Sequence, residues 1–279
     1  MRIAVASGKG GTGKTLVSTN LSAAARSWLV DLDVEAPNCH LFPFSGQETV
    51  QSIHRPVPYV SQEDCSSCGK CASFCRFGAV MHIKGQVKFR EEACHSCGAC
   101  MDLCPRKAIL MRERKIGELV YLAGIHRSLV YGLMRIGEPS TVPLIRAVKE
   151  RIPENVNAVL DCPPGVGCGV TEALSGADVC LLVTEPTPFG MHDLGLAIKL
   201  VRKMGIPALL LLNKVGLRDK DASEYLEYLD KFDLEIAASL PFSRFIAEKY
   251  SKGELLIEEP RWKELFSRLW EKCLEVADK

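Results

Sequence analysis

The sequence predicts an α/β fold in which a doubly wound, mostly parallel sheet is interrupted by a small cysteine-rich unit. Short apolar segments typical of buried strands alternate with helical segments over most of the 279 residues. A glycine-rich loop separates the first of these strands from the first helix. Between residues 57 and 112 the alternation stops, and eight of the 13 cysteines of the chain fall in this stretch.

The expected elements follow one another in the order of an α/β domain. Residues 2–7 are short, apolar and followed by glycine, which predicts a buried strand, and the alanine-rich residues 15–27 predict a helix. Residues 28–32 predict a second buried strand. Further strands are expected over 156–160, 179–184 and 206–213, and further helices over 142–151, 170–175, 192–204, 220–231, 244–251 and 262–274. Residues 117–140 fit neither pattern well, and they either lead back from the cysteine-rich stretch or line the site at the sheet edge.

The composition narrows the class of protein. A hydrophobic fraction of 47% is ample for a packed core, and a formal net charge of +1 gives no bulk attraction for nucleic acid or a membrane surface. No apolar run approaches the roughly 18 residues of a spanning helix, and the N-terminus lacks the features of a signal peptide. We therefore expect a cytoplasmic protein, in which this density of cysteine favours metal ligation over disulfides.

The glycine-rich loop is a specific phosphate-binding motif. It reads Gly8-Lys9-Gly10-Gly11-Thr12-Gly13-Lys14-Thr15 and fits G-x4-G-K-T between a strand and a helix. Its glycines let backbone N–H groups close on phosphates, and the helix N-terminus adds a positive dipole end. We expect Lys14 to reach the β- and γ-phosphates of ATP, and the Thr15 hydroxyl to ligate Mg²⁺.

Eight cysteines form two copies of a second motif. Both copies read C-x2-C-x2-C-x3-C, which is the ligand run of a two-cluster bacterial ferredoxin. A single zinc ion usually takes two separated C-x2-C pairs, so we expect two 4Fe–4S clusters. In the two-cluster pattern the fourth cysteine of each run binds the other cluster. The first cluster would take Cys65, Cys68, Cys71 and Cys104, and the second would take Cys94, Cys97, Cys100 and Cys75.

The residues around the two cysteine runs repeat as well. Gly69 and Gly98 are in register at an offset of 29 residues, as expected of a duplicated half-domain. We therefore expect an inserted small α+β domain like a bacterial ferredoxin over residues 57–112, and a discontinuous ATPase domain over 1–56 and 113–279. Arg76 stands where the pattern has proline after Cys75. It either raises the potential of the nearby cluster or is a surface arginine without electronic effect.

The extra lysine in the phosphate loop, Lys9, carries a family resemblance. With it the chain resembles the deviant-Walker ATPases of the MinD/ParA/Mrp group, which are SIMIBI-type P-loop ATPases and include the nitrogenase iron protein. The resemblance covers residues 1–55 and 113–279, and MinD-superfamily ATPases with an inserted ferredoxin domain resemble the whole chain. It implies a nucleotide-dependent homodimer in which Lys9 reaches the phosphates of the partner. The alternative is a lysine that is merely solvated beside the loop.

Other motifs of the same group follow the predicted strands. Val30-Asp31-Leu32-Asp33 resembles its second acidic motif, and Asp161-Cys162-Pro163-Pro164-Gly165 resembles its D-x-P-P-G switch. The resemblance implies that Asp33 positions the attacking water, that Asp31 supports Mg²⁺ or the loop, and that Asp161 holds Mg²⁺ through water. The alternative for these aspartates is helix capping. Further implied roles are a γ-phosphate contact for the Gly165 amide, a place near the dimer interface for Asn38, and adenine contacts for Asn213, Lys214 and Pro241.

Five cysteines remain outside the two runs. Cys180 and Cys273 are expected in the core. Cys168 lies seven residues past Asp161, where the nitrogenase iron protein has a bridging-cluster ligand. No second ligand is evident, so a small buried residue is the favoured interpretation, with a metal ligand or a redox-responsive thiol as alternatives. Cys39 and Cys162 receive no role.

The terminal helix and the function each leave alternatives. Residues 262–274 are amphipathic with a mixed-charge polar face, which favours packing on the sheet over membrane binding. For the function we prefer a Mg²⁺-dependent ATPase, slow without a partner, that gates electron transfer to an unknown redox partner. An iron–sulfur assembly scaffold or carrier that serves a recipient protein is the second hypothesis, although no C-x-x-C lies outside residues 65–104. A partner-regulating ATPase with structural clusters is the third.

Overall fold

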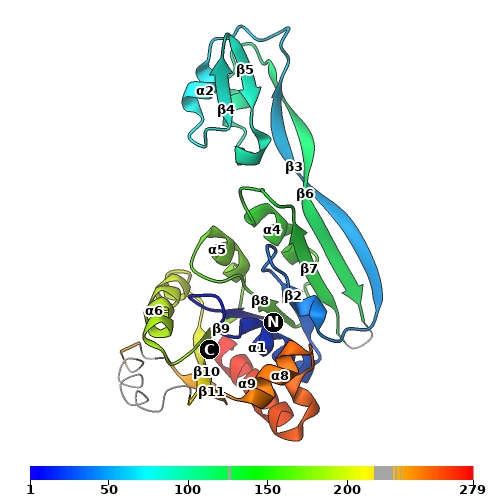
Figure 1. Ribbon diagram of the computed structural model, residues 1–279, viewed down its shortest axis with the longest axis vertical. Helices are drawn as coiled ribbons and strands as arrows, with labels where there is room; N and C mark the ends of the chain where they lie inside the picture. Colours follow the sequence, from blue (N-terminus) through cyan, green and yellow to red (C-terminus); the bar gives the residue numbers. More distant parts are fainter. Residues whose placement is uncertain (125–126, 217–228, 230, 233, 279) are drawn as a thin grey trace.

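The computed structural model describes residues 1–124, 127–216, 229, 231–232 and 234–278. Within these residues one large sheet has the strand order β11-β10-β9-β1-β8-β2-β7-β6-β3 (Figure 1). Neighbouring strands are parallel from β11 to β7, while β6 is antiparallel to both β7 and β3. The α/β fold with a large, mostly parallel sheet is thereby confirmed. The strand bounds are β1 (Arg2–Ala6), β2 (Trp28–Asp31), β3 (Gln47–Val60), β6 (Ile109–Ala123), β7 (Leu129–Met134), β8 (Ala158–Asp161), β9 (Val179–Thr184), β10 (Ala208–Val215) and β11 (Ile236–Pro241).

Helices cover both faces of the sheet, as the doubly wound architecture requires. One face packs against α1 (Lys14–Ala25), α8 (Arg244–Ser251) and α9 (Pro260–Ala277) through the first hydrophobic cluster. The other packs against α4 (Val142–Glu150), α5 (Cys168–Leu174) and α6 (Pro188–Lys203) through the second. Short 3-10 turns are η1 (Cys39–Leu41) and η3 (Leu256–Glu258).

The terminal helix α9 docks on the sheet. Its apolar residues Trp262, Phe266, Leu269 and Cys273 are buried in the core, so the packing interpretation is confirmed. Among the described residues, none of the helices combines the length and the apolar character needed to cross a bilayer.

A long two-stranded ribbon carries the cysteine-rich unit away from the sheet (Figure 1). Strand β3 pairs with β6 from Gln47–Ala123 at the base to Val60–Ile109 at the far end, with one register shift between Ile53 and His54. Only the lower part of β6, residues 117–122, also pairs with β7. The predicted domain limits 57 and 112 are cross-strand partners within the ribbon, and the division into domains stays a prediction.

The sequence analysis missed this ribbon for physical reasons. Pro56 and Pro58 indicate an entry to the cysteine-rich stretch, yet both lie in β3, the edge strand, where a missing N–H donor costs no ladder bond on the free side. Most of β3 is exposed, so it lacks the apolar run of the other strands. Of the unassigned residues 117–140, those that the structure describes include the lower half of β6, strand β7 and the turn that leads to α4.

The cysteine-rich unit is small and repeats itself. It contains α2 (Lys70–Phe74), β4 (Val80–Ile83), β5 (Gln86–Phe89), η2 (Glu91–Ala93) and α3 (Ala99–Asp102), with β4 and β5 forming a separate antiparallel pair. Both short helices begin after a glycine with positive φ, 71° at Gly69 and 76° at Gly98. Two residues earlier, Ser67 and Ser96 also have positive φ, at 54° and 56°. The sequence repeat is therefore also a backbone repeat.

Several predicted bounds need correction. Helix α6 begins at Pro188, not at 192, because Thr187 caps it by accepting from the Gly190 N–H. Strand β11 was not predicted at all. Most of the helix predicted over 220–231 lies outside the described residues.

Candidate functional site

The phosphate loop lies between β1 and α1 at the carboxyl end of the central strands. Gly11 and Gly13 have φ of 77° and 97°, a region that favours glycine. A Cβ on Gly13 would lie 2.2 Å from the Nδ2 atom of Asn213, and one on Gly8 would lie 2.0 Å from the Asp193 carbonyl oxygen. The loop therefore requires glycine at both ends because neighbouring segments press against its backbone.

Two aspartates meet where neighbouring strands end. Asp31 on β2 and Asp161 on β8 are register partners. Asp161 accepts hydrogen bonds from the Thr15 hydroxyl at 2.8 Å and the Ser18 hydroxyl at 2.9 Å. The predicted Mg²⁺ residues Thr15 and Asp161 are thus in direct contact, on the first turn of α1 and the end of β8.

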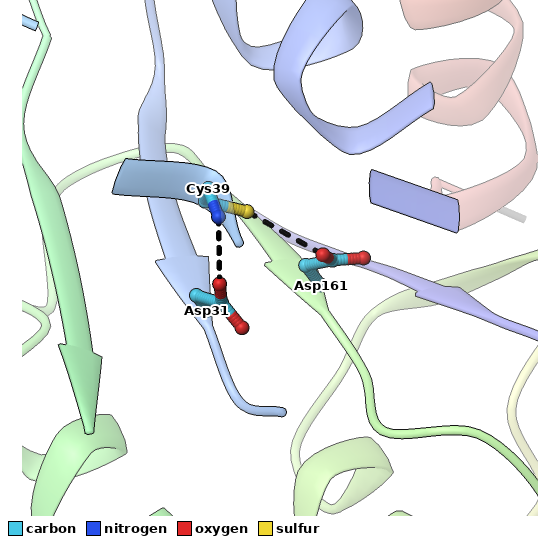
Figure 2. Close-up of side chains that lie close together, drawn as sticks. All are labelled: Asp31, Cys39 and Asp161. Atoms are coloured by element: carbon cyan, nitrogen blue, oxygen red, sulfur yellow. Dashed lines mark hydrogen bonds between the residues drawn. The ribbon is translucent and has the colours of Figure 1, made fainter. Parts of the chain in front are cut away.

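Asp31 binds the backbone of the segment that follows β2. Its carboxylate accepts backbone N–H groups from Asp33 at 3.1 Å and from Asn38 and Cys39 at 2.9 Å each. Figure 2 shows Cys39 between the two aspartates, with its N–H toward Asp31 and its Sγ toward Asp161 at 3.4 Å. Asp31 therefore fixes the loop that follows β2, while it also adds negative charge beside Asp161.

The carboxyl groups of Asp31, Asp33 and Asp161 favour a bound cation. Burial, with the charge of Asp161 added, raises the pKa of Asp31 to about 7 and that of Asp33 to about 6. Burial also raises the pKa of Asp161, against the hydrogen bonds from Thr15 and Ser18 and the charge of Lys14. The donor set of carboxylate and hydroxyl oxygens suits Mg²⁺, which prefers oxygen ligands. The residues thus fit a magnesium ion held by Thr15 and Asp161, with Asp31 behind them.

The switch loop borders a hollow of about 190 Å³. Asp33, Pro163, Pro164 and Gly167 line it, together with Thr141. The Gly165 amide, to which we assigned a γ-phosphate contact, donates to the Ser7 carbonyl oxygen at 3.0 Å. That amide can therefore reach a phosphate only after the switch loop moves.

An open pocket of about 300 Å³ lies on the other side of the phosphate loop. The three residues assigned to adenine, Asn213, Lys214 and Pro241, line it together with Phe242 and Tyr250. Asn213 donates to the Thr12 carbonyl oxygen at 2.7 Å, and Lys214 donates to the Gly11 carbonyl oxygen at 2.8 Å. The base pocket and the phosphate loop are therefore tied together.

Glu185, which the sequence analysis missed, holds two lysines of this site. It is hydrogen-bonded to Lys9 and lies 3.1 Å from the Nζ atom of Lys214. Burial works to raise the pKa of its carboxyl, but the two lysines outweigh burial and the pKa is lowered. Its place directly after β9, at the edge where the other polar residues gather, was the available signal. Lys9 is bound within its own chain here, and Asn38 is exposed.

The two predicted cysteine sets line two separate hollows in the small unit. One hollow of about 180 Å³ is bordered by the second set, Cys75, Cys94, Cys97 and Cys100. The other, of about 20 Å³, is bordered by the first set, Cys65, Cys68, Cys71 and Cys104. Cys71 borders both.

The spacing of the thiols argues against single zinc ions. Zinc–sulfur bonds of about 2.3 Å place tetrahedral thiolates about 3.8 Å apart. Among the described residues, Asp31, Cys39 and Asp161 form a group of potential metal ligands whose ligand atoms all lie within 4.8 Å of one another. The eight cysteines, all of which are described, form no such group of three or more. Backbone N–H groups of Ser96 and Ala108 donate to Cys94 Sγ and Cys104 Sγ at 3.3 Å each, which are contacts that tune iron–sulfur potentials. Four thiols around a hollow therefore fit a cluster better than an ion.

The remaining cysteines divide by exposure. Cys39, Cys162, Cys180 and Cys273 are buried, which confirms the core positions of Cys180 and Cys273. Cys168 is exposed at the start of α5, so the favoured interpretation of a buried residue is wrong. The loop that follows Gly165 runs over the surface before the helix turns inward at Val170.

Comparison with known proteins agrees with this geometry. Residues 3–257 match the family described as the CobQ/CobB/MinD/ParA nucleotide binding domain. The chain belongs to this family. An uncharacterized protein of Methanocaldococcus jannaschii is 30% identical over 268 residues, which are 92% of each chain. The iron-sulfur cluster carrier protein of Aquifex aeolicus is 24% identical, over 91% of this chain and 61% of that protein.

A solved structure shares the fold. The septum site-determining protein MinD from Pyrococcus horikoshii, in complex with Mg-ADP, superposes with a TM-score of 0.57 at 18% identity. The match covers 97% of this chain and 94% of that one. Family membership makes the chain a nucleotide-binding protein of the MinD/ParA type.

Proposed function

We propose that the protein is a Mg²⁺-dependent ATPase in which a nucleotide-driven change of a homodimer controls electron transfer through two 4Fe–4S clusters. One observation carries the proposal. Two cysteine tetrads border separate hollows at the end of a ribbon whose strands are continuous with the nucleotide-binding sheet. Because the nucleotide site and the cysteine unit belong to one sheet, a displacement at one can be transmitted to the other through the strands between them.

The ATPase half of the proposal uses residues that already lie together. The loop from Gly8 to Lys14 would bind the phosphates, Thr15 and Asp161 would hold Mg²⁺, and Asn213, Lys214 and Pro241 would receive the adenine. Asp33 would orient the attacking water, and its raised pKa of about 6 also lets it accept a proton near neutral pH. Positioning and charge stabilisation suffice for phosphoryl transfer, so no covalent intermediate is needed.

Lys9 supplies the reason for a dimer and for slow basal hydrolysis. In the single chain it is paired with Glu185, whose side chain is 12% exposed. To stabilise the phosphates of a second chain, Lys9 must leave this carboxylate. Hydrolysis without a partner is then slow because that exchange precedes it.

The cysteine half assigns one tetrad to each cluster. Bound clusters of this kind accept and release single electrons. The protein would hold them with eight thiolates, tune them through the Ser96 and Ala108 N–H groups, and expose Cys68 and Cys97 at the surface. Electron donor and acceptor would dock at that surface.

An iron–sulfur carrier is the second candidate. The Aquifex aeolicus relative, an iron-sulfur cluster carrier protein, aligns with 91% of this chain. Exposed thiols at Cys68 and Cys97 also leave a bound cluster open to transfer. In that case ATP would control delivery of the cluster, not its potential.

One anaerobic experiment separates the candidates. Protein reconstituted with iron and sulfide is analysed for iron content, and the midpoint potentials are measured with and without MgATP. We expect about eight irons per chain and a shift of about 60 mV or more in at least one potential, a tenfold change in a one-electron equilibrium. Equal potentials, combined with ATP-dependent iron transfer to an apo-ferredoxin, would favour the carrier. Fewer than four irons per chain would reject both.

A further inference from the structure

A buried ion-pair network sits where the ribbon leaves the sheet. Arg55 on β3 and Arg114 on β6 both bind Glu138, in the turn between β7 and α4, at 3.1 and 3.0 Å. The Glu138 side chain is only 1% exposed and that of Arg55 only 6%. Buried charges are stable only while every partner is in place, so this turn and the ribbon are held in one relative position.

The upper end of the network reaches the second cysteine set. The Arg55 guanidinium donates to the Ser96 hydroxyl at 2.9 Å and to the Glu91 carbonyl oxygen at 2.8 Å. Ser96 stands between Cys94 and Cys97, and its N–H donates to Cys94 Sγ. It also borders the larger hollow. Arg55 therefore fixes the backbone that presents two of the four thiols.

The lower end reaches the switch loop. Glu138 lies three residues before Thr141, where α4 begins. A Cβ on Gly169, in the first turn of α5, would be 2.6 Å from the Thr141 hydroxyl oxygen, so the two segments are in close contact. Thr141 and Gly169 border the same hollow as Asp33 and Pro163. Gly169 lies four residues after Gly165, so this contact adjoins the part of the switch loop that would move to bring its amide to a phosphate.

Within the described residues, the network contacts one cysteine set and not the other. Among the described residues, the hydrogen bonds of Arg55, Arg114 and Glu138 lead to the segment 91–96 and to one another, but not to the first cysteine set. The two sets share a sequence pattern, yet over the part of the chain that the structure describes this network contacts only the second set.

We propose that Glu138, Arg55 and Arg114 are positioning residues that transmit the nucleotide state to the second cysteine set and leave the first set unaffected. The inference rests on the proposed function, since it names the path by which that coupling runs. Arg55 is central because three different nitrogens of its planar guanidinium bond Glu138, Ser96 and Glu91 at once, whereas a lysine has a single nitrogen.

The test is hydrogen–deuterium exchange of the reconstituted holoprotein with and without a non-hydrolysable MgATP analogue. Wild type is compared with Arg55→Lys, with the milder Ser96→Ala, and with the control Arg112→Gln. Arg112 lies on the same ribbon and binds Glu91 but makes no bond to Glu138 or Ser96. We expect the analogue to change exchange in residues 91–100 at least threefold, and to leave residues 65–71 unchanged. Arg55→Lys should abolish the change, Ser96→Ala should at least halve it, and Arg112→Gln should keep it.

The outcomes separate this inference from the function on which it rests. A change over 91–100 that survives both Arg55→Lys and Ser96→Ala overturns the inference, as does an equal change over 65–71. If Arg55→Lys does not fold, Ser96→Ala alone decides. Absence of any change in wild type also overturns it. The proposed function is judged separately, by iron content and by potentials of the wild type, so a nucleotide-dependent potential without this exchange pattern rejects only the network.

Discussion

The candidate site at the sheet edge and the cysteine-rich unit differ in how far the protein alone orders them. At the sheet edge, Asp161, Asp31 and Asn213 are each hydrogen-bonded to neighbouring segments, so the site is shaped by the protein itself. In the cysteine-rich unit, over residues 57–112, the hydrophobic cluster is small and is centred on the buried residues Cys71, Val80, Val87 and Ile109. The comparison teaches that the site at the sheet edge is preorganised by its own hydrogen bonds, while we expect the stability of the small unit to depend on what its thiols bind.

Removal of iron tests this comparison with the largest expected effect. Chelation of the reconstituted protein should raise amide exchange over residues 57–112 at least about a hundredfold, because metal binding supplies most of the folding free energy of such small units. Exchange in β1, β8 and β9 should stay within twofold, and ATP affinity should persist. A unit that keeps its protection without iron would break the comparison.

Loss of the phosphate-loop lysine tests the other end. Lys14→Ala should lower kcat/KM for ATP hydrolysis by about 10²–10³, the usual cost of removing a preorganised charge-stabilising donor. Iron content should not change. Lys203→Ala, an exposed lysine at the end of α6, is the matched control and should leave both quantities unaltered.

The acidic corner makes the preorganised end sensitive to pH. The pKa values of Asp31 and Asp33, about 7 and about 6, lie above the 3.8 of an exposed aspartate because of burial and the charge of Asp161. Between pH 4 and 7 these two carboxyl groups therefore bind more protons in the folded state than in the unfolded state, and their contribution to the free energy of unfolding falls as the pH rises.

The measurement is thermal unfolding without Mg²⁺ at pH 5 and pH 7.5. We expect a loss of a few kcal/mol, at about 1.4 kcal/mol per pKa unit, that saturating MgADP reverses. Asp31→Asn should flatten the profile, and Glu271→Gln on the exposed face of α9 should not. An Asp31→Asn profile with the same slope as the wild type would contradict the assigned burial effect.

The smallest predicted effect concerns the carboxylate that binds the two lysines. Glu185→Gln should raise nucleotide-dependent dimerisation up to about tenfold, since a partly exposed ion pair contributes about 1 kcal/mol or less. Analytical ultracentrifugation with an ATP analogue measures it. Weaker dimerisation in this variant would show that Glu185 supports the dimer and does not compete with it.

Sequence predicted best what depends on local patterns. The loop at residues 8–15, the aspartates at strand ends and the two cysteine sets are fixed by spacing, and the structure brings each group together. Contacts between distant segments left no such pattern. Glu185 meets Lys9 only after β9 folds beside β1, and Arg55 meets Glu138 only through the ribbon. The ribbon itself was missed because an exposed edge strand tolerates proline and needs no apolar run.

The ribbon also changes how the chain can fold. Residues 54–116 separate two parts of one sheet, and closing a flexible loop of that length would cost roughly 3–4 kcal/mol. Strands β3 and β6 pair Ile53 with Gly117, so the ends of the insert are already adjacent once the ribbon forms. For the folding of the remaining strands, the insert then has the same effect as a connection no longer than a tight hairpin turn.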